Sequence, residues 1–313
     1  MNLEIPLVSI GIPTYNRPDG LRRTLNRIIS QTYTNLEIIV SDNCSNNSEV
    51  TGVIDEFSKK DHRIVGIRQK ENIGAGNNFK FVLDKASGVY FIWAADDDEW
   101  LGIDFVDKLV KHAHQNILTF SAALFNRTDG LYDYPLKAYE NSRDKFEYLD
   151  VLCSNGLGYP VYGLYNLKLF KDHKLNFQFD EDLVYYNEGV FLHKIFLTGL
   201  VKYVKDAEIL FSTDSIKPSY DTRIDNFVKY FKRLLQLYAN TSHLSDKEKS
   251  ILISKVFSLH MNHLDSLFRD FVLSEKHGLS FSYSLSKDSR NSSLVNKIKR
   301  RIVRTAKVFV KCY

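Results

Sequence analysis

Three consecutive aspartates, Asp96, Asp97 and Asp98, follow an apolar run at residues 90–95. Neighbouring carboxylates repel one another, and it is costly to hold them together in a protein unless a cation neutralises them. Mg²⁺ and Mn²⁺ prefer such hard oxygen ligands and commonly keep substrate phosphates in their remaining coordination positions. The cluster therefore predicts a divalent metal site that grips a diphosphate. The alternative is a solvated acidic loop.

The chain before this cluster alternates between strand and helix patterns. Pro18 favours the start of a helix that Asn16 is predicted to cap, and the later helices are expected near residues 50–60 and 77–86. This order predicts an α/β fold, a mostly parallel sheet with helices on both faces, followed by a helical C-terminal region. The apolar runs that predict the strands lie at residues 7–12, 36–40, 64–67 and 90–94.

Polar residues follow each predicted strand. Because ligands bind outside the carboxyl ends of the strands in such sheets, these residues are expected to form one site with the aspartates. They are Pro13, Thr14, Tyr15 and Asn16 after the first strand, Asp42 and Asn43 after the second, and Asn72 and Gly74 after the third.

The motifs resemble those of glycosyltransferase family 2, a large family of inverting transferases with the Rossmann-like GT-A fold. Each motif alone is common, but five of them in the family's order and with compatible spacing are a specific match. The resemblance covers residues 1–110 and continues more weakly to residue 210. The matching segments are residues 8–17, 30–33, 37–43, 72–74 and 96–100.

The resemblance implies a nucleotide-sugar donor, of UDP type, and a divalent cofactor, Mn²⁺ or Mg²⁺. Thr14 and Tyr15 would flank the base, with the Tyr15 ring stacked on it, and Asp42 would accept a hydrogen bond from a base N–H. Core packing for Tyr15 and a simple turn role for Asp42 are the alternatives. The implied donor-binding residues are Pro13, Thr14, Tyr15, Asn16, Asp42, Asn72, Gly74 and Asp96.

The family's acidic motif is usually Asp-x-Asp, and Ala95 stands at its first position here. With Trp100 aligned to the family's tryptophan, the resemblance assigns the metal to Asp97 and Asp98, and Asp97 is the principal ligand. Asp96 then lies near the ribose or the sugar.

Inverting transfer needs a general base that deprotonates the acceptor hydroxyl, and a carboxylate is the usual choice. Residues 187–199 resemble the family's base-bearing helix, with Glu188 at the base position where the family normally has Asp. Asp182 is a second candidate. The structural alternative is that Glu188 only stabilises the start of a helix.

The domains are predicted as a GT-A domain at 1–220, a helical extension at 221–277, a linker at 278–292 and a basic amphipathic helix at 293–313. A capping box from Ser245 to Glu248 is predicted to open a helix that extends to Ser274. Seven of the 42 basic residues and no acidic residue lie in 293–313, which leaves 35 basic against 38 acidic residues elsewhere. The tail is therefore expected to contact an anionic membrane surface, the alternative being a helix docked on the domain.

These patterns favour a non-processive glycosyltransferase that acts at the cytoplasmic face of the cell membrane on a glycan or polyprenyl-linked acceptor. Capsule and O-antigen are examples of the surface polysaccharides such enzymes build. The body of the chain is not basic, so nucleic acid is not an expected partner. Cys44, Cys153 and Cys312 show no metal-ligand spacing and fit a reducing compartment. A sugar nucleotidyltransferase would need a Gly-rich phosphate loop after the first strand, whereas a non-catalytic nucleotide-sugar-binding relic remains compatible with Ala95.

Overall fold

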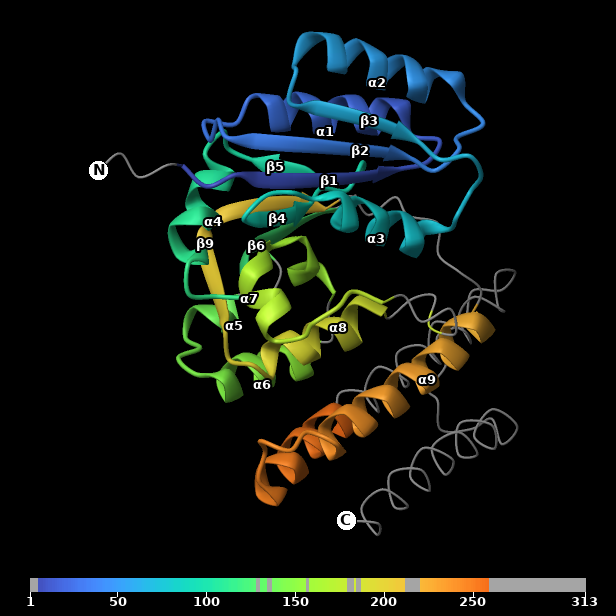
Figure 1. Cartoon of the computed structure of the whole chain (residues 1–313). Coiled ribbons are helices and arrows are strands. Elements are labelled where there is room, and N and C mark those ends of the chain that lie inside the picture. Colours follow the sequence, from blue (N-terminus) through green and yellow to red (C-terminus); the bar gives the residue numbers. More distant parts are fainter. Residues whose placement is uncertain are drawn as a thin grey trace. The chain divides into compact units, whose positions relative to one another are not determined.

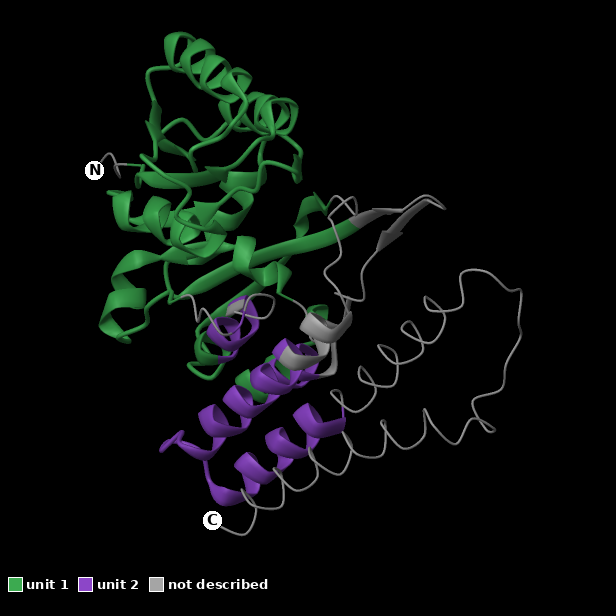
Figure 2. Cartoon of the chain, turned by 90° about the vertical axis from the view of Figure 1, so that its right-hand side faces the viewer, with its two compact units in different colours: residues 1–148, 157–179, 194–215 green, residues 149–156, 180–193, 216–313 purple. Residues whose placement is uncertain are grey.

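The computed structural model describes residues 5–127, 130–133, 137–155, 158–178, 183, 187–211 and 220–258. Asp182, the predicted linker at 278–292 and the predicted tail helix at 293–313 lie outside these residues. The chain divides into two compact units, which Figure 2 colours separately. Among the described residues, none of the helices combines the length and the apolar character that crossing a membrane requires.

The first unit begins with the predicted alternation of strands and helices (Figure 1). All seven residues of the first strand are buried, as expected for a parallel strand that is covered on both faces. The elements are β1 (Val8–Thr14), α1 (Pro18–Ile29), β2 (Leu36–Asp42), α2 (Ser48–Lys60), β3 (Ile64–Arg68), α3 (Ala75–Lys85) and β4 (Tyr90–Trp93).

The order of these strands in the sheet explains where the helices lie. The strands are parallel and run β3-β2-β1-β4 across the sheet. Because parallel crossovers are right-handed, α1 and α2, which connect strands in one direction, cover one face. The connection through α3 runs back past β2 and β1, so α3 covers the opposite face (Figure 1). Thr14 pairs with Asp42 and Asp42 with Arg68, so the strand ends lie side by side.

The remainder of the sheet is mixed rather than uniformly parallel. β8 (Leu164–Asn166) pairs antiparallel with β4 and with β6 (Leu118–Arg127), while β9 (Val201–Phe211) runs parallel to β6. The α/β class is confirmed, and the strands β1 to β4 form the part of the sheet that is uniformly parallel. The other elements of this region are β5 (Glu99–Leu101), α4 (Phe105–Ala113), β7 (Gly130–Asp133), α5 (Lys137–Glu140), α6 (Lys145–Asn155), a 3-10 helix (Tyr159–Tyr162) and α7 (Leu167–Asp172).

The second unit is helical and contains residues 187–193 of α8 (Asn187–Phe196), α9 (Tyr220–Ala239) and a helix over residues 246–258. The predicted capping box is present, since the N–H of Ser245 donates to Glu248 Oε2 (2.7 Å) and the N–H of Glu248 donates to Ser245 Oγ (3.3 Å). The part of the predicted helix from 259 to 274 lies outside the described residues. Residues 149–156 and 180–193 group with 216–313 in this unit, whereas the predicted boundary lies at 220.

Candidate active site

The aspartate cluster is held against the first turns of α1. A Cβ added at Gly20 would lie 2.0 Å from the carbonyl oxygen of Asp96, so only glycine permits this approach. One turn further along, Thr24 Oγ1 donates to the carbonyl of Ala95 (3.1 Å). The N-terminus of α1, which carries a partial positive charge, therefore lies beside the acids and favours negative charge there.

Asn16 does not cap α1, contrary to the sequence-based prediction. Its φ is +57°, and the N-cap position is held by Arg17 without a side-chain hydrogen bond. Asn16 Oδ1 instead accepts hydrogen bonds from the N–H groups of Asn46 (2.8 Å) and Asn47 (3.3 Å). The side chain is used to tie the β1–α1 loop to the β2–α2 loop, which leaves none of its oxygen capacity for the helix.

Asp96 is buried, with 7% of its surface exposed, and Oδ2 accepts a hydrogen bond from Thr14 Oγ1 (2.7 Å). Desolvation raises the pKa of the Asp96 carboxyl to about 6, although the Thr14 hydroxyl and the nearby Arg17 favour its charged form. A buried carboxylate of this kind is a costly feature in the absence of a cation or a ligand that would stabilise it.

A cavity of about 390 Å³ opens at this edge of the sheet. Tyr15 is 38% exposed and borders it, so the core-packing alternative for this residue is wrong. Four of the predicted donor-binding and metal-binding residues do not line the cavity, namely Asn16, Asp42, Gly74 and Asp98. The lining residues are Pro13, Thr14, Tyr15, Arg17, Asn43, Asn72, Ala75, Asn78, Phe79, Ala95, Asp96, Asp97 and Tyr162.

Arg17 is the cation of this cavity that sequence reasoning missed. Its guanidinium forms an ion pair with Asp97 and lies 3.5 Å from Asp96 Oδ1. Partial burial opposes the charge of Arg17, but the hydrogen bond to Asp97 and the charges of the three aspartates outweigh it and raise its pKa. The residue belongs to the matched segment 8–17, but a basic residue in a loop gives no sign of where its long side chain points.

The donor set at the cavity fits a divalent cation that is shared with a substrate. Asp96 and Asp97 present hard carboxylate oxygens to the cavity, whereas Asp98 does not line it. Within the described ranges, three or more His, Cys, Asp or Glu side chains do not gather into a metal-binding group. Mg²⁺ and similar ions are commonly held by one or two carboxylates with phosphate oxygens and water completing the shell. The site therefore suits a metal that binds together with a diphosphate.

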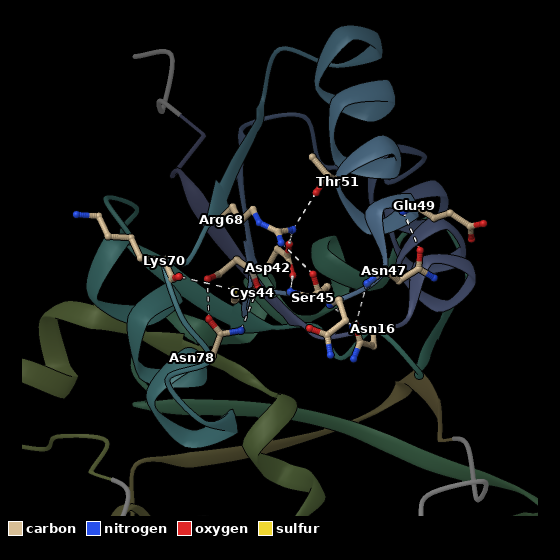
Figure 3. Close-up of polar contacts among 12 residues, drawn as sticks. Asn16, Asp42, Cys44, Ser45, Asn47, Glu49, Thr51, Arg68, Lys70 and Asn78 are labelled. Carbon is tan, nitrogen blue, oxygen red and sulfur yellow. Dashed lines mark hydrogen bonds and ion pairs between the residues drawn. The ribbon is translucent and has the colours of Figure 1, made fainter.

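Asp42 does not line the cavity and is fully buried. Figure 3 shows its side chain together with Ser45 and Arg68, to which it is hydrogen-bonded. Oδ2 accepts a hydrogen bond from Arg68 Nη1 (2.6 Å), and Oδ1 accepts one from the N–H of Ser45 (2.9 Å). Arg68 Nη2 also donates to the carbonyl of Ser45 (2.9 Å). The hydrogen bond from the N–H of Ser45 agrees with the turn role that was the alternative for Asp42. Arg68, at the end of β3, is a second cation that the sequence pattern did not identify.

The loop before α3 is fixed by two asparagines. Asn43 Nδ2 donates to Asn72 Oδ1 (3.0 Å), and that oxygen also accepts the N–H of Gly74 (2.9 Å). The N–H of Ile73 donates to Asn43 Oδ1 (2.9 Å). Gly74 has a φ of +82°, which favours glycine, and immediately precedes α3. Asn43 and Asn72 therefore orient the N-terminus of α3 beside the cavity. Gly74 provides the backbone conformation that this turn requires and does not line the cavity.

Glu188 belongs to the second unit, in the first turn of α8. The residue is half-buried, and desolvation of its carboxyl raises its pKa, opposed by a hydrogen bond from its own backbone N–H. The backbone contact agrees with a helix-start role, and the raised pKa agrees with a proton acceptor.

Comparison with known proteins places the chain in a family. The family model described as glycosyl transferase family 2 matches residues 9–173, more than half of the chain, and the protein belongs to that family. The matched segment carries the acid cluster, the cavity lining and the strands β1 to β4, apart from Val8 at the start of β1.

Relatives differ in length and in how much of the chain they match. An uncharacterised glycosyltransferase of Haemophilus influenzae is 24% identical over 95% of this chain and 98% of its own length. Glycosyltransferase GlyA of Streptococcus pneumoniae is 34% identical over 43% of this chain, which spans only 20% of GlyA. TuaG of Bacillus subtilis, provisionally assigned to teichuronic acid biosynthesis, is 27% identical over 49% of this chain and 60% of its own.

Solved structures confirm the GT-A type of fold. TarS residues 1–349 of S. aureus in complex with UDP superpose with a TM-score of 0.63 at 17% identity, covering 82% of this chain and 72% of that one. The mannosyltransferase PcManGT of Pyrobaculum calidifontis, in complex with GDP-Man and Mn²⁺, gives a TM-score of 0.59 at 14% identity, covering 98% of this chain and 84% of that one.

Proposed function

We propose that this protein is a metal-dependent, inverting and non-processive glycosyltransferase that moves a hexose from a nucleotide sugar to a glycan or lipid-linked acceptor. The observation that carries the proposal is the cavity at the carboxyl ends of β1 and β4, where Thr14, Asp96 and Asp97 meet. A nucleoside diphosphate fits this arrangement because it needs an aromatic face, hydrogen-bond acceptors and a cation-binding acid within one cavity.

The donor is proposed to be of UDP type. Tyr15, exposed at the cavity, offers its ring to the base, and the ion pair of the buried Asp42 with Arg68 holds the neighbouring strand ends in place. Solved relatives of the fold support a nucleotide-sugar donor, since TarS is in complex with UDP and PcManGT with GDP-Man and Mn²⁺. Asp97, with Asp96 beside it, would hold the cation, which supplies positive charge to the leaving diphosphate.

Glu188 is proposed as the general base, with Asp182 as the second candidate. A carboxylate with a raised pKa is a better proton acceptor than an ordinary one, and desolvation raises the pKa of Glu188. Removal of the acceptor proton would let its oxygen attack the anomeric carbon from the face opposite the leaving diphosphate, which inverts the configuration.

The acceptor is proposed to belong to surface polysaccharide synthesis, such as capsule or O-antigen, at the cytoplasmic face of the membrane. The assignment of TuaG to teichuronic acid biosynthesis supports this class of product. The basic residues at 293–313 support a peripheral membrane location, because each would be attracted to anionic lipid.

A non-catalytic donor-binding protein is the second candidate, because Ala95 replaces the first acid of the family's motif. A sugar nucleotidyltransferase is less compatible, since β1 is followed by Pro13 to Asn16 rather than by a Gly-rich phosphate loop.

The test is a thermal-shift screen of nucleotide sugars with and without Mn²⁺, followed by assays of donor hydrolysis and sugar transfer. A ligand that binds only the folded protein raises its melting temperature, and we expect a UDP-sugar to do so in the presence of Mn²⁺. Asp97→Asn should abolish the Mn²⁺-dependent part of the shift. Glu99→Gln is the matched control, because Glu99 pairs with Arg27 and does not line the cavity.

Glu188→Gln and Asp182→Asn separate donor binding from transfer. The variant that lacks the base should bind the donor normally and lose transfer, while the other retains both. Normal transfer by Glu188→Gln would overturn its assignment. Donor binding without hydrolysis or transfer in the wild type, over a broad set of acceptors, would favour the non-catalytic protein.

A further inference from the structure

The guanidinium of Arg17 lies where a cation would have to bind. Its Nη1 forms an ion pair with Asp97 Oδ2 and lies 3.5 Å from Asp96 Oδ1, and all three residues line the same cavity. The two carboxylates best suited to hold a metal are therefore already partly neutralised by a side chain of the protein.

The backbone that carries Arg17 is fixed, whereas its side chain is not enclosed. Asn16 is held by its own N–H, which donates to Ser45 Oγ (2.8 Å), and by its amide oxygen on Asn46 and Asn47. Pro18 follows at the start of α1 and restricts the backbone further. The Arg17 side chain is 45% exposed, so its long stem can turn within the cavity without a change in the loop.

A guanidinium and a divalent cation compete for the same oxygens. Both are positive, and two cations on one carboxylate at contact distance repel each other strongly in a partly buried site. A metal ion that arrives alone must therefore displace Arg17 and leave it without a counter-ion. A diphosphate changes this balance, because its oxygens offer the planar guanidinium an alternative partner of matching geometry.

We propose that Arg17 is a displaceable counter-ion that blocks Asp97 from the metal until the donor's diphosphate draws the guanidinium away. Arg17 thereby couples the binding of metal and nucleotide, so that each strengthens the other. The proposal rests on the proposed function, because it takes the ligands to be a divalent cation and a nucleoside diphosphate.

The chain offers a matched control in the pair of Arg27 with Glu99. It is also an ion pair between α1 and the chain that follows β4, and both of its side chains are partly exposed. Neither residue lines the cavity. Loss of Arg27 removes one positive charge from the same helix without freeing a carboxylate at the candidate metal site.

The experiment measures Mn²⁺ binding to the full chain from the electron paramagnetic resonance signal of free Mn²⁺, with and without saturating UDP. In the wild type we expect weak Mn²⁺ binding that UDP strengthens by about tenfold or more, a coupling of ordinary size between two sites. In Arg17→Gln, Mn²⁺ should bind about tenfold more tightly without UDP, and UDP should strengthen Mn²⁺ binding by a smaller factor than in the wild type, because only direct coordination of the ion by the diphosphate remains. Arg27→Gln should behave as the wild type.

Reciprocity provides a second readout. Because coupling acts equally on both ligands, Mn²⁺ should strengthen UDP binding in calorimetry by the same factor by which UDP strengthens Mn²⁺ binding, and this factor should be smaller in Arg17→Gln than in the wild type. The proposal is overturned if Arg17→Gln keeps the wild-type coupling, or if Arg27→Gln loses it equally. Failure of the wild type to bind Mn²⁺ even with UDP would instead overturn the proposed function, and this inference with it.

Discussion

Asp42 and Asp96 are both buried at the edge of the sheet, but their carboxylates meet different partners. Asp42 accepts hydrogen bonds from the Arg68 guanidinium and from the N–H of Ser45. Asp96 accepts one from the Thr14 hydroxyl, and the nearest Arg17 nitrogen lies 3.5 Å away. The charge of Asp42 therefore has a closer cationic partner than that of Asp96, whose pKa desolvation raises and whose charge a bound cation would stabilise further.

The first prediction concerns Asp42→Asn, which removes a charge from the pair with Arg68. A hydrogen bond to a charged group contributes about 1.5–3 kcal/mol, and the exposure of Arg68 places the loss at the lower end of this range. Denaturant unfolding should show this loss, and calorimetry should show weaker UDP binding. Arg68→Met is the companion variant. If both variants lose stability and neither loses UDP affinity, the pair holds the loop and does not contact the base.

The second prediction concerns Glu37, which connects β2 to the turn before β4. Ser87 donates to it from its N–H (3.0 Å) and its hydroxyl (2.7 Å), and Ser9 donates a third hydrogen bond. Desolvation raises the pKa of Glu37, but these hydrogen bonds outweigh it and the net pKa is lowered. A lowered carboxyl pKa stabilises the fold above the unfolded-state value of about 4.3, and this contribution is lost as the pH falls through the folded-state pKa.

Glu37→Gln should therefore lower the free energy of unfolding at pH 7 by on the order of 1 kcal/mol, a modest value because the carboxylate is partly exposed. Urea unfolding from pH 7 to pH 3 should show the difference from the wild type shrinking below the unfolded-state pKa. If the difference in unfolding free energy stays constant with pH, the charge of Glu37 does not contribute to stability.

Single residues of the site were predictable where they lie one to four residues after the end of a strand. Tyr15, Asn72 and Asp97 do so, and all three line the cavity. Tyr162 was not predictable, because a 3-10 helix distant in sequence brings it there. The direction of the Arg17 side chain was not predictable either, since it depends on acids at the end of another strand.

At the scale of elements, α9 packs closely against α8, the helix that carries Glu188. A Cβ added at Gly189 would lie 2.6 Å from the hydroxyl oxygen of Tyr230. One turn later, His193 Nδ1 and Tyr238 Oη share a hydrogen bond of 2.5 Å, and both side chains are buried. Two contacts along the helix thus hold the start of α8 in one position, so α9 is a positioning element for Glu188.

The third prediction tests this packing by making the same substitution, glycine to alanine, in α8 and in a control helix. Gly189→Ala must displace Tyr230, and overpacking of this kind costs about 1–3 kcal/mol, more than the helix propensity that alanine gains. Transfer should fall while UDP binding persists. Gly52→Ala in α2 is the control, because nothing lies within 4 Å of the added Cβ, and it should stabilise the protein by roughly 0.5–1 kcal/mol. Unchanged transfer and stability in Gly189→Ala would refute the positioning role.

The elements of the first half were predictable because each is encoded by a local pattern. The strands from β1 to β4 are buried apolar runs, and helices of regular period separate them. The second half was not predictable as a sheet. β5 and β8 have three residues each, which is too short for a periodic pattern, and β6 pairs with β9 across a long stretch of chain.

At the scale of the whole molecule, basic and acidic residues are distributed unevenly along the chain. The excess of basic residues belongs to 293–313, and the remainder is slightly acidic. This distribution concerns attraction to other surfaces rather than the fold, since net charge acts on association. If the acceptor is lipid-linked, a basic segment would raise the concentration of the enzyme at the surface where that acceptor resides.

The last prediction is that deletion of residues 293–313 abolishes sedimentation with vesicles containing an anionic lipid and leaves Mn²⁺-dependent UDP binding unchanged. Each basic residue near such a surface contributes about 1 kcal/mol, so Gln at both Arg300 and Arg301 should weaken vesicle binding roughly 30-fold. Neutral vesicles should bind wild type and variants equally weakly. If the segment instead packs on the protein, its deletion would lower the melting temperature and leave sedimentation unchanged, because the apolar face of residues 294–310 would then be covered by the protein rather than by lipid.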